Sequence, residues 1–288
     1  PAQEVKTINY LNEDCPKHSK YTLARPRVFI PIVLGVNGEY DMERAFRSAG
    51  AEVVSFLLRT RSPQDIKNSV KEMAKLIKNS QIIAFAGGIS SIDETGGSGK
   101  FVAAVFQDPI LSEAVSELVY DRDGLIIGIG GGFEALLKLG LLPFGKICQP
   151  KDDSPSLTTN NINRHVSTIA RVRICSAKSP WLAGVQAGDI FGTPISTAEG
   201  KFAASMEDLK KMEQNGQIFS QFVDDQGNPS AHAPYNPTGS IWAIEGIISC
   251  DGKILGRLGH IERCQSGYKN IDLPMDQKIF ESGTRYFK

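Results

Sequence analysis

Short apolar runs alternate with amphipathic stretches along the first half of the chain. The apolar runs have the length of strands, and their near-continuous apolar character predicts that both faces of each strand are buried. They span residues 27–35, 52–58, 81–88 and 125–129. Between them, the spacing of apolar residues and the capping positions predict helices over 39–48, 63–77 and 109–120. This alternation predicts an α/β fold with a parallel sheet that helices cover on both faces.

The pattern changes from about Ser156 onward. Shorter strands with polar interruptions are predicted over 167–175, 189–195, 217–223, 240–248 and 254–258. A helix is predicted over 206–214, and a closing helix from Met275 to Phe287 follows Pro274. Sites in parallel α/β sheets collect at the carboxyl ends of the strands. We therefore expect a site among the loops that follow the first, third and fourth strands.

The charges of the chain are balanced, with 32 Lys and Arg residues against 32 Asp and Glu residues, and no segment concentrates one sign. Neither nucleic acid nor an anionic membrane surface is therefore an expected partner. No apolar run approaches the roughly 20 residues that a spanning helix needs, and no signal-peptide pattern opens the chain. We therefore expect a cytoplasmic protein.

The first 25 residues are polar and irregular, and the chain starts at Pro1 without a methionine. Such a segment is typical of a linker that belongs to a longer polypeptide. We expect residues 1–25 to be a linker or N-terminal extension. Residues 26–288 are then long enough to bury the core of one domain. The five scattered cysteines form no Cys-x-x-Cys pair, which predicts neither a disulfide framework nor a zinc site.

A glycine run follows the fourth predicted strand, in the segment LIIGIGGGFEALLKLGLL. It does not fit a dinucleotide loop, because Phe133 stands at the last glycine position and the strand is the fourth instead of the first. The segment ETGGSGKF does not fit a phosphate-binding loop, because Glu94 and Phe101 replace two of its required residues. We therefore expect no cofactor and no metal. A strand, tight turn and helix often present a nucleophile, yet the tip at Gly130 has no side chain.

Six segments indicate the family that the chain resembles. They are RPRVFIPIVLGVNGEYD, GSGKFVAAVF, RDGLIIGIGGGFEALLKLGLLPFG, SPWLAGV, NPTGSIWAIEGI and LGHIER. Their order and spacing from Arg25 to Lys288 resemble class I (triad-type) glutamine amidotransferases. More narrowly, they resemble the C-terminal glutaminase domain of phosphoribosylformylglycinamidine synthase in its long single-chain bacterial form.

The resemblance implies a flavodoxin-like three-layer sandwich, with a mostly parallel central sheet and additional antiparallel strands in the C-terminal half. It implies synthetase domains of the same polypeptide as the partner and glutamine as the ancestral ligand. In this family the elbow carries a cysteine whose thiolate attacks the glutamine amide and releases ammonia, and that position falls on Gly130. His260 and Glu262 match a His-x-Glu motif, in which the imidazole transfers protons and the carboxylate orients it. The proton-transferring pair is present, whereas the nucleophile is absent.

The resemblance also implies substrate-binding positions. Gly87 and Gly88 match the backbone that supplies oxyanion-hole donors. The chain departs from the family pattern at Gly131 and Glu134, and in the loop that holds Ser196 and Thr197. The family has asparagine, glutamine and a Ser-His-Gly-Glu-Gly loop at these places.

Two further loops, 34–38 and 89–93, depart in the same way. We interpret these clustered changes as the mark of a site whose chemistry is no longer under selection. Glu134 is then either an exposed carboxylate or a group that binds a cationic ligand. The histidines outside the motif are expected to be surface or structural residues, namely His18, His165 and His232.

Three functions stay open at this level. A glutaminase-like domain that no longer hydrolyses glutamine would persist as a structural or interaction domain. A working glutamine-dependent component would need a substitute nucleophile or a water activated by His260. A regulatory module would bind a ligand in the old pocket. Glycine at the elbow favours the first, because a residue with a Cβ is strained there by about 1–3 kcal/mol and glycine is not.

Overall fold

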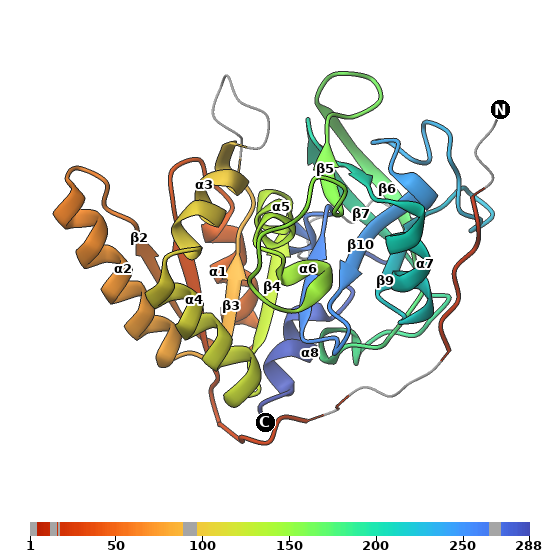
Figure 1. Ribbon diagram of the computed structural model, residues 1–288. Coiled ribbons are helices and arrows are strands. Elements are labelled where there is room, and N and C mark those ends of the chain that lie inside the picture. Colours follow the sequence, from red (N-terminus) through yellow and green to blue (C-terminus); the bar gives the residue numbers. More distant parts are fainter. Residues whose placement is uncertain (1–4, 12–15, 17, 89–96, 265–271) are drawn as a thin grey trace.

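A nine-stranded mixed sheet runs through the molecule, in the order β2-β1-β3-β4-β11-β10-β9-β6-β7. The computed structural model describes residues 5–11, 16, 18–88, 97–264 and 272–288 (Figure 1). The strands of this sheet are β1 (Arg27–Ile32), β2 (Glu52–Leu57), β3 (Ile82–Phe85), β4 (Leu125–Ile129), β6 (Val166–Ile174), β7 (Ile190–Thr197), β9 (Ile218–Phe222), β10 (Ile244–Ile248) and β11 (Ile254–Arg257). A separate two-stranded sheet pairs β5 (Ser156–Thr158) with β8 (Lys201–Ala203).

The sheet changes character at β11. Strands β2, β1, β3, β4 and β11 are parallel to their neighbours in that group. Beyond β11, the strands β10, β9, β6 and β7 pair antiparallel. The prediction of a parallel core with added antiparallel strands from the C-terminal half is therefore confirmed. Since β11 lies beside β4, the late loop that follows β11 is brought next to the turn that follows β4.

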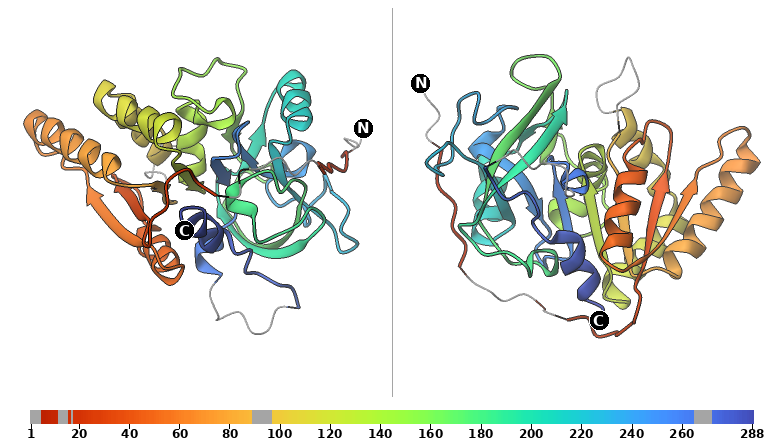
Figure 2. Two further views of the ribbon diagram at one scale, coloured as in Figure 1. Left: turned by 90° about the horizontal axis from the view of Figure 1, so that it is seen from below. Right: turned by 180° about the vertical axis from the view of Figure 1, so that it is seen from behind.

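Helices cover both faces of the parallel half, as Figures 1 and 2 show. One face carries α1 (Glu39–Ser48) and the C-terminal α8 (Ile279–Arg285), which contact one another. The opposite face carries α2 (Pro63–Lys78), α3 (Gly97–Phe106), α4 (Pro109–Ser116) and α5 (Gly131–Lys138). The short α6 (Leu141–Phe144) follows α5, and α7 (Met206–Gln214) flanks the antiparallel strands. The three layers are those of the predicted α/β sandwich.

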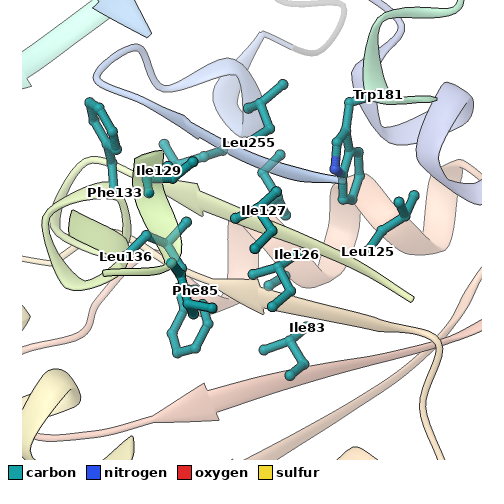
Figure 3. Packing of buried hydrophobic residues seen from close by; sticks show 14 of the residues in the cluster. Ile83, Phe85, Leu125, Ile126, Ile127, Ile129, Phe133, Leu136, Trp181 and Leu255 are labelled. Atoms are coloured by element: carbon teal, nitrogen blue, oxygen red, sulfur yellow. The ribbon is translucent and has the colours of Figure 1, made fainter. Parts of the chain in front are cut away.

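The hydrophobic core fills both interfaces between the sheet and its helices. Every residue of β3 and β4 is buried. Figure 3 shows Ile83, Phe85, Ile126 and Ile127 of these strands packed with Leu136 of α5 and with Trp181. On the face of α1 and α8, Phe46 meets the rings of Trp181 and Phe280 edge-on, with centroids 6.3 Å and 5.0 Å away.

Two glycines bring α5 close to the sheet. A Cβ on Gly128 would lie 2.6 Å from the carbonyl oxygen of Gly132, and one on Gly132 would lie 2.0 Å from the carbonyl oxygen of Phe85. No side chain fits at either place, because real Cβ contacts are not shorter than about 3 Å. The glycine run after β4 is therefore explained in part by packing. The start of α5 lies directly against the end of β3.

The closing helix is shorter than predicted. It begins at Ile279, and Lys278 before it has a left-handed backbone with φ of 55°. Gln277 accounts for the difference, because its side chain hydrogen-bonds Arg257 and Thr193 and holds this stretch against β7. Residues 275–277 are thus outside the helix, where helical spacing predicted a first turn.

The residues before β1 lie along the surface of the domain (Figure 1). Ile8 is buried, and the Tyr10 amide donates a hydrogen bond to the Cys175 carbonyl at 2.8 Å. Further along, the Ser19 and Leu23 amides bond to carbonyls of the last two aromatic residues of the chain. The boundary at residue 26 stays a prediction, but the described part of the extension has contacts of its own. No helix within the described residues is long and apolar enough to span a membrane.

Candidate functional site

The turn after β4 has the backbone of an elbow. Gly130 has φ of 55° and ψ of −115°, a conformation in which a side chain is strained and glycine is not. Its amide donates to the carbonyl of Arg257 at 2.9 Å, and its carbonyl accepts from the Glu134 amide at 3.1 Å. The turn is therefore anchored to β11 on one side and to the first turn of α5 on the other.

The imidazole of His260 faces this turn. An ideal Cβ on Gly130 would lie 3.3 Å from His260 Cε1 and 3.5 Å from Nε2. A Cβ on Gly87 would lie 3.1 Å from the same Cε1. The ring is thus enclosed by the elbow and by the loop after β3. Any side chain at position 130 would contact it directly.

His260 and Glu262 form a buried pair at the end of β11. Their exposed fractions are 5% and 1%. Nδ1 of the ring lies 2.6 Å from Oε1 of the carboxylate. Nδ1 is therefore the ring nitrogen that is hydrogen-bonded to the carboxylate, and Nε2 is the ring nitrogen on the side of the elbow. The amide of His260 donates to the carbonyl of Pro194 at 2.8 Å, which fixes the loop against β7.

The loop after β3 contributes main chain to the site. The carbonyl of Gly87 accepts the amides of Asn37 and Gly38 at 3.1 Å and 3.0 Å. A Cβ on Gly88 would lie 2.0 Å from the carbonyl oxygen of Gly35, so this position admits only glycine. The amides at the start of α5, beginning with Gly131, have no partner within the helix. The start of α5 can therefore present backbone donors beside this loop.

A pocket of about 330 Å³ opens in front of the elbow. Most of the predicted site residues line it, namely Gly88, Gly130, Gly131, Glu134, Ser196, Thr197 and His260. Gly87 and Glu262 do not line it, although both lie next to the ring of His260. The changed loops 34–38 and 196–200 reach it through Asn37 and through Ala198 and Glu199, whereas 89–93 lies outside the described residues.

Three residues that the sequence did not indicate also line the pocket: Leu157, His165 and Arg263. His165 is exposed as expected, but its Nε2 lies 3.2 Å from the Ser196 hydroxyl at the pocket wall. Arg263 immediately follows the His-x-Glu motif, and its guanidinium lies 3.4 Å from Asp41 of α1. The sequence signal that could have indicated Arg263 was its position directly after the His-x-Glu motif. Nothing local marked His165, which reaches the pocket because β6 pairs with β7.

Glu134 is not the exposed carboxylate that one interpretation predicted. It is 7% exposed, lies in the pocket wall, and its Oε1 is 3.3 Å from Nζ of Lys138. A Cβ on Gly99 would lie 2.8 Å from its Oε2, so α3 packs directly over the carboxyl group. Burial raises the pKa of Glu134, and Lys138 opposes that rise.

No described cysteine lines the pocket. Among the described cysteines, Cys264 is closest to His260 in the sequence, and its Sγ lies 3.7 Å from the carbonyl oxygen of His260. Burial raises the pKa of Cys264 to about 12, which keeps it a thiol at neutral pH. Cys175 is fully buried and bonded to Gln221, and burial likewise raises its pKa to about 12. Within the part of the chain that the structure describes, no thiolate faces His260.

A buried ion pair between Arg257 and Glu245 supports the loop that carries His260. Arg257 and Glu245 are both fully buried, and two guanidinium nitrogens lie 3.1 Å and 3.0 Å from the carboxylate oxygens. The carboxylate also accepts the Gly259 amide at 2.7 Å and the Ser220 hydroxyl at 2.5 Å. This network holds the residue directly before His260. Among the described residues, no three His, Cys, Asp or Glu side chains converge as a metal site would require.

The fold and the site define a glutamine amidotransferase domain. The family model of the CobB/CobQ-like glutamine amidotransferase domain matches residues 25–288, and the chain belongs to this family.

Named relatives narrow the comparison. The chain is 28% identical over 239 residues to phosphoribosylformylglycinamidine synthase subunit PurQ of Methanococcus maripaludis, covering 83% of this chain and 82% of that subunit. It is 30% identical over 248 residues to the phosphoribosylformylglycinamidine synthase of Homo sapiens, covering 83% of this chain but 18% of that protein. The structure of PurLQS from Thermotoga maritima superposes with a TM-score of 0.64 at 19% identity, over 92% of this chain and all of that one.

Proposed function

We propose that this chain is the glutaminase-type domain of a phosphoribosylformylglycinamidine synthase, in a long single-chain form, that has lost its thiol chemistry. The relatives named for that enzyme support the assignment to purine biosynthesis. The match to 18% of the length of the human phosphoribosylformylglycinamidine synthase supports a place within a longer polypeptide. The proposed loss of function rests on the contact geometry between position 130 and His260. A side chain at position 130 would be the group that the imidazole activates.

The chemistry explains why glycine at this place ends the reaction. A triad amidotransferase forms a thioester with the glutamyl group and releases ammonia, and the imidazole gives and takes the protons of that exchange. Gly130 has no atom that can form the acyl bond. The buried His260–Glu262 pair, 2.6 Å apart, can still orient and deprotonate a group. Without a nucleophile, the pair has no covalent step in which to transfer protons. We expect the domain to need no cofactor.

A second function is favoured by the same intact pair. A water molecule activated by His260 would hydrolyse glutamine directly. Loss of the covalent step normally costs several orders of magnitude in rate.

We therefore propose that the domain persists as a structural partner of the synthetase domains, and that ammonia comes from solution or from another subunit.

The test compares nitrogen donors in the full polypeptide that carries this domain. We expect turnover with ammonium and little or none with glutamine. Glutamine-dependent turnover comparable to that with ammonium contradicts the proposal. Ammonia release by the isolated chain that disappears in His260→Ala would support the water mechanism instead. A glutamine-mimicking alkylating reagent should leave the mass of the chain unchanged, and an adduct on Cys148 or Cys264 would reveal a substitute nucleophile.

A further inference from the structure

The side chain of Gln221 joins separate parts of the chain. It lies in β9 and is fully buried. Its Oε1 accepts the amide of Ile8 at 3.0 Å, and its Nε2 donates to the carbonyl oxygens of Lys6 at 3.0 Å and Trp242 at 2.7 Å. Two of these three partners belong to the N-terminal extension, and the third belongs to the segment that enters β10. The side chain therefore holds both segments, because a buried amide left without partners is costly.

The N-terminal residues that meet this amide are anchored at further points. Ile8 is buried in the hydrophobic core, and its carbonyl oxygen accepts from the guanidinium of Arg173 at 3.1 Å. Two residues further on, the ring of Tyr10 packs on Gly216, where a Cβ would lie 2.5 Å from Cδ1 of the ring. Residues 6–10 thus dock as one unit, which we call the docked segment.

The third partner, Trp242, begins a turn that residues with a side chain seldom adopt. Trp242 and Ala243 have φ of 51° and 55°, in the left-handed region that favours glycine. Residues with a Cβ stay in this region only where their surroundings hold them there. The hydrogen bond from Gln221 to the Trp242 carbonyl is one such hold, and the complete burial of Ala243 is another. Loss of this hydrogen bond would therefore favour a relaxed turn.

Strand β10 follows the turn directly and opens with an irregularity. Its pairing with β9 shifts register between Ile244 and Gly246, so Glu245 lies within a bulge. Bulges change the direction in which a side chain points. Glu245 is fully buried, and its carboxylate accepts the amide of Gly259 at 2.7 Å, directly before His260. The conformation of the turn therefore bears on the residue that precedes the imidazole.

We propose that Gln221 is a positioning residue for His260, and that the docked segment keeps Gln221 in place. With the segment docked, Gln221 holds the left-handed turn, the turn fixes the bulge, and Glu245 holds the loop that carries His260. Release of the segment removes two partners of the Gln221 amide and favours the relaxed turn. Docking of the segment and order in the His260 loop are then coupled, and the coupling acts in both directions. It requires no nucleophile at position 130, so it is independent of the proposed loss of glutaminase activity.

Hydrogen–deuterium exchange of the 288-residue chain tests this proposal. The amides of residues 258–260 report on the loop that carries His260, since each is hydrogen-bonded, and those of β3 report on the parallel half. Gln221→Leu removes the hydrogen bonds of the side-chain amide, and Ile8→Ala weakens the docked segment. In both variants we expect exchange at 258–260, relative to β3, to accelerate at least about tenfold. Unchanged relative exchange in either folded variant overturns the proposal, and Ile8→Ala keeps the test valid if Gln221→Leu does not fold.

A second change tests the route through the turn. Ala243→Gly removes the strain at this residue, because glycine adopts the left-handed conformation freely. Added to Gln221→Leu or to Ile8→Ala, it should restore most of the protection of residues 258–260. The imidazole resonances of His260 in nuclear magnetic resonance spectra should shift in the single variants and return with Ala243→Gly. Failure of this change to restore either signal contradicts the route through the turn.

Ile77→Ala is the matched control for a general loss of stability. This fully buried side chain belongs to α2 and lies outside the route from the docked segment to His260. The variant should be less stable than the parent, yet exchange at 258–260 relative to β3 should stay as in the parent. An acceleration as large as that in Ile8→Ala would reflect general destabilisation and would overturn the proposal.

Discussion

Gly130 and His260 are in contact geometry although 130 positions separate them in the chain: an ideal Cβ on the glycine would lie 3.5 Å from Nε2 of the imidazole. This relationship results from the parallel pairing of β4 with β11, which ends both strands at one edge of the sheet. We propose that the elbow, the imidazole and its carboxylate keep the arrangement of a triad in which position 130 has no reacting atom.

Gly130→Cys should restore glutamine hydrolysis. The new Sγ would stand beside Nε2, and the backbone strain of a residue with a Cβ would cost about 1–3 kcal/mol of stability. Ammonia release and mass spectrometry after treatment with a glutamine-mimicking reagent measure the outcome. The double variant with His260→Gln is the control and should stay inactive. A folded Gly130→Cys protein that neither reacts nor releases ammonia would show that the loops around the pocket, and not the missing thiol alone, have ended the activity.

Arg257→Met should destabilise the fold by about 3–5 kcal/mol, because it leaves the carboxylate of Glu245 buried without its partner charge. The double variant Arg257→Met with Glu245→Leu should lose less than Arg257→Met alone, since it removes both charges. Urea unfolding of the four proteins in the cycle gives the coupling energy. A loss below about 1 kcal/mol for Arg257→Met is incompatible with the buried network described here.

Asp123 should make stability depend on acid pH. Burial raises its pKa, but hydrogen bonds from Lys253, from the Lys20 amide and from Tyr286 outweigh burial and lower the pKa overall. A carboxylate with a lowered folded-state pKa stabilises above the ordinary Asp value of about 3.9, and that stability is lost as pH falls through the folded-state value.

Asp123→Asn should therefore cost about 1–3 kcal/mol at pH 7, and the difference from the parent should shrink below about pH 4. Asparagine is the suitable replacement because residue 123 has φ of 56°, which asparagine tolerates. Urea unfolding at neutral and acid pH measures this difference. A constant difference across the range would mean that the charge of Asp123 contributes nothing.

Ile8→Ala tests whether the N-terminal extension is part of the folded domain. The Ile8 side chain is 2% exposed, and its removal from a cooperative core costs about 2–5 kcal/mol. Leu11→Ala is the matched control, because that side chain is 80% exposed and its loss should change little. Thermal and urea unfolding compare the two variants. Equal and small effects would place the extension outside the cooperative unit.

Local patterns in the sequence were sufficient for most of the parallel half of the fold, although α3 (Gly97–Phe106) was not among the helices predicted above. The predicted helix over 39–48 matches α1, and the predicted strand over 125–129 matches β4. Helical spacing, caps and buried apolar runs are properties of neighbouring residues, so they are visible without tertiary structure. The same holds for the turn at Gly130, whereas His260 and Glu262 were indicated by their resemblance to a family motif.

Other features depend on contacts between distant segments. The partnership of Arg257 with Glu245 joins two strands, and its only local sign was a charge inside each of two apolar runs. The late start of the closing helix, after Lys278, follows from the bond between Gln277 and Arg257.

The sequence by itself determined the succession of strands and helices along the chain and the chemical identity of the elbow, because these depend on neighbouring side chains. Only the tertiary structure decided that Glu134 is buried and that His165 and Ser196 meet beside it in one pocket. The physical reason is that a pocket is formed where the ends of separate strands meet. The residues that face the pocket are selected by the order of the strands within the sheet and by their register. Neither can be read from the local spacing of apolar residues.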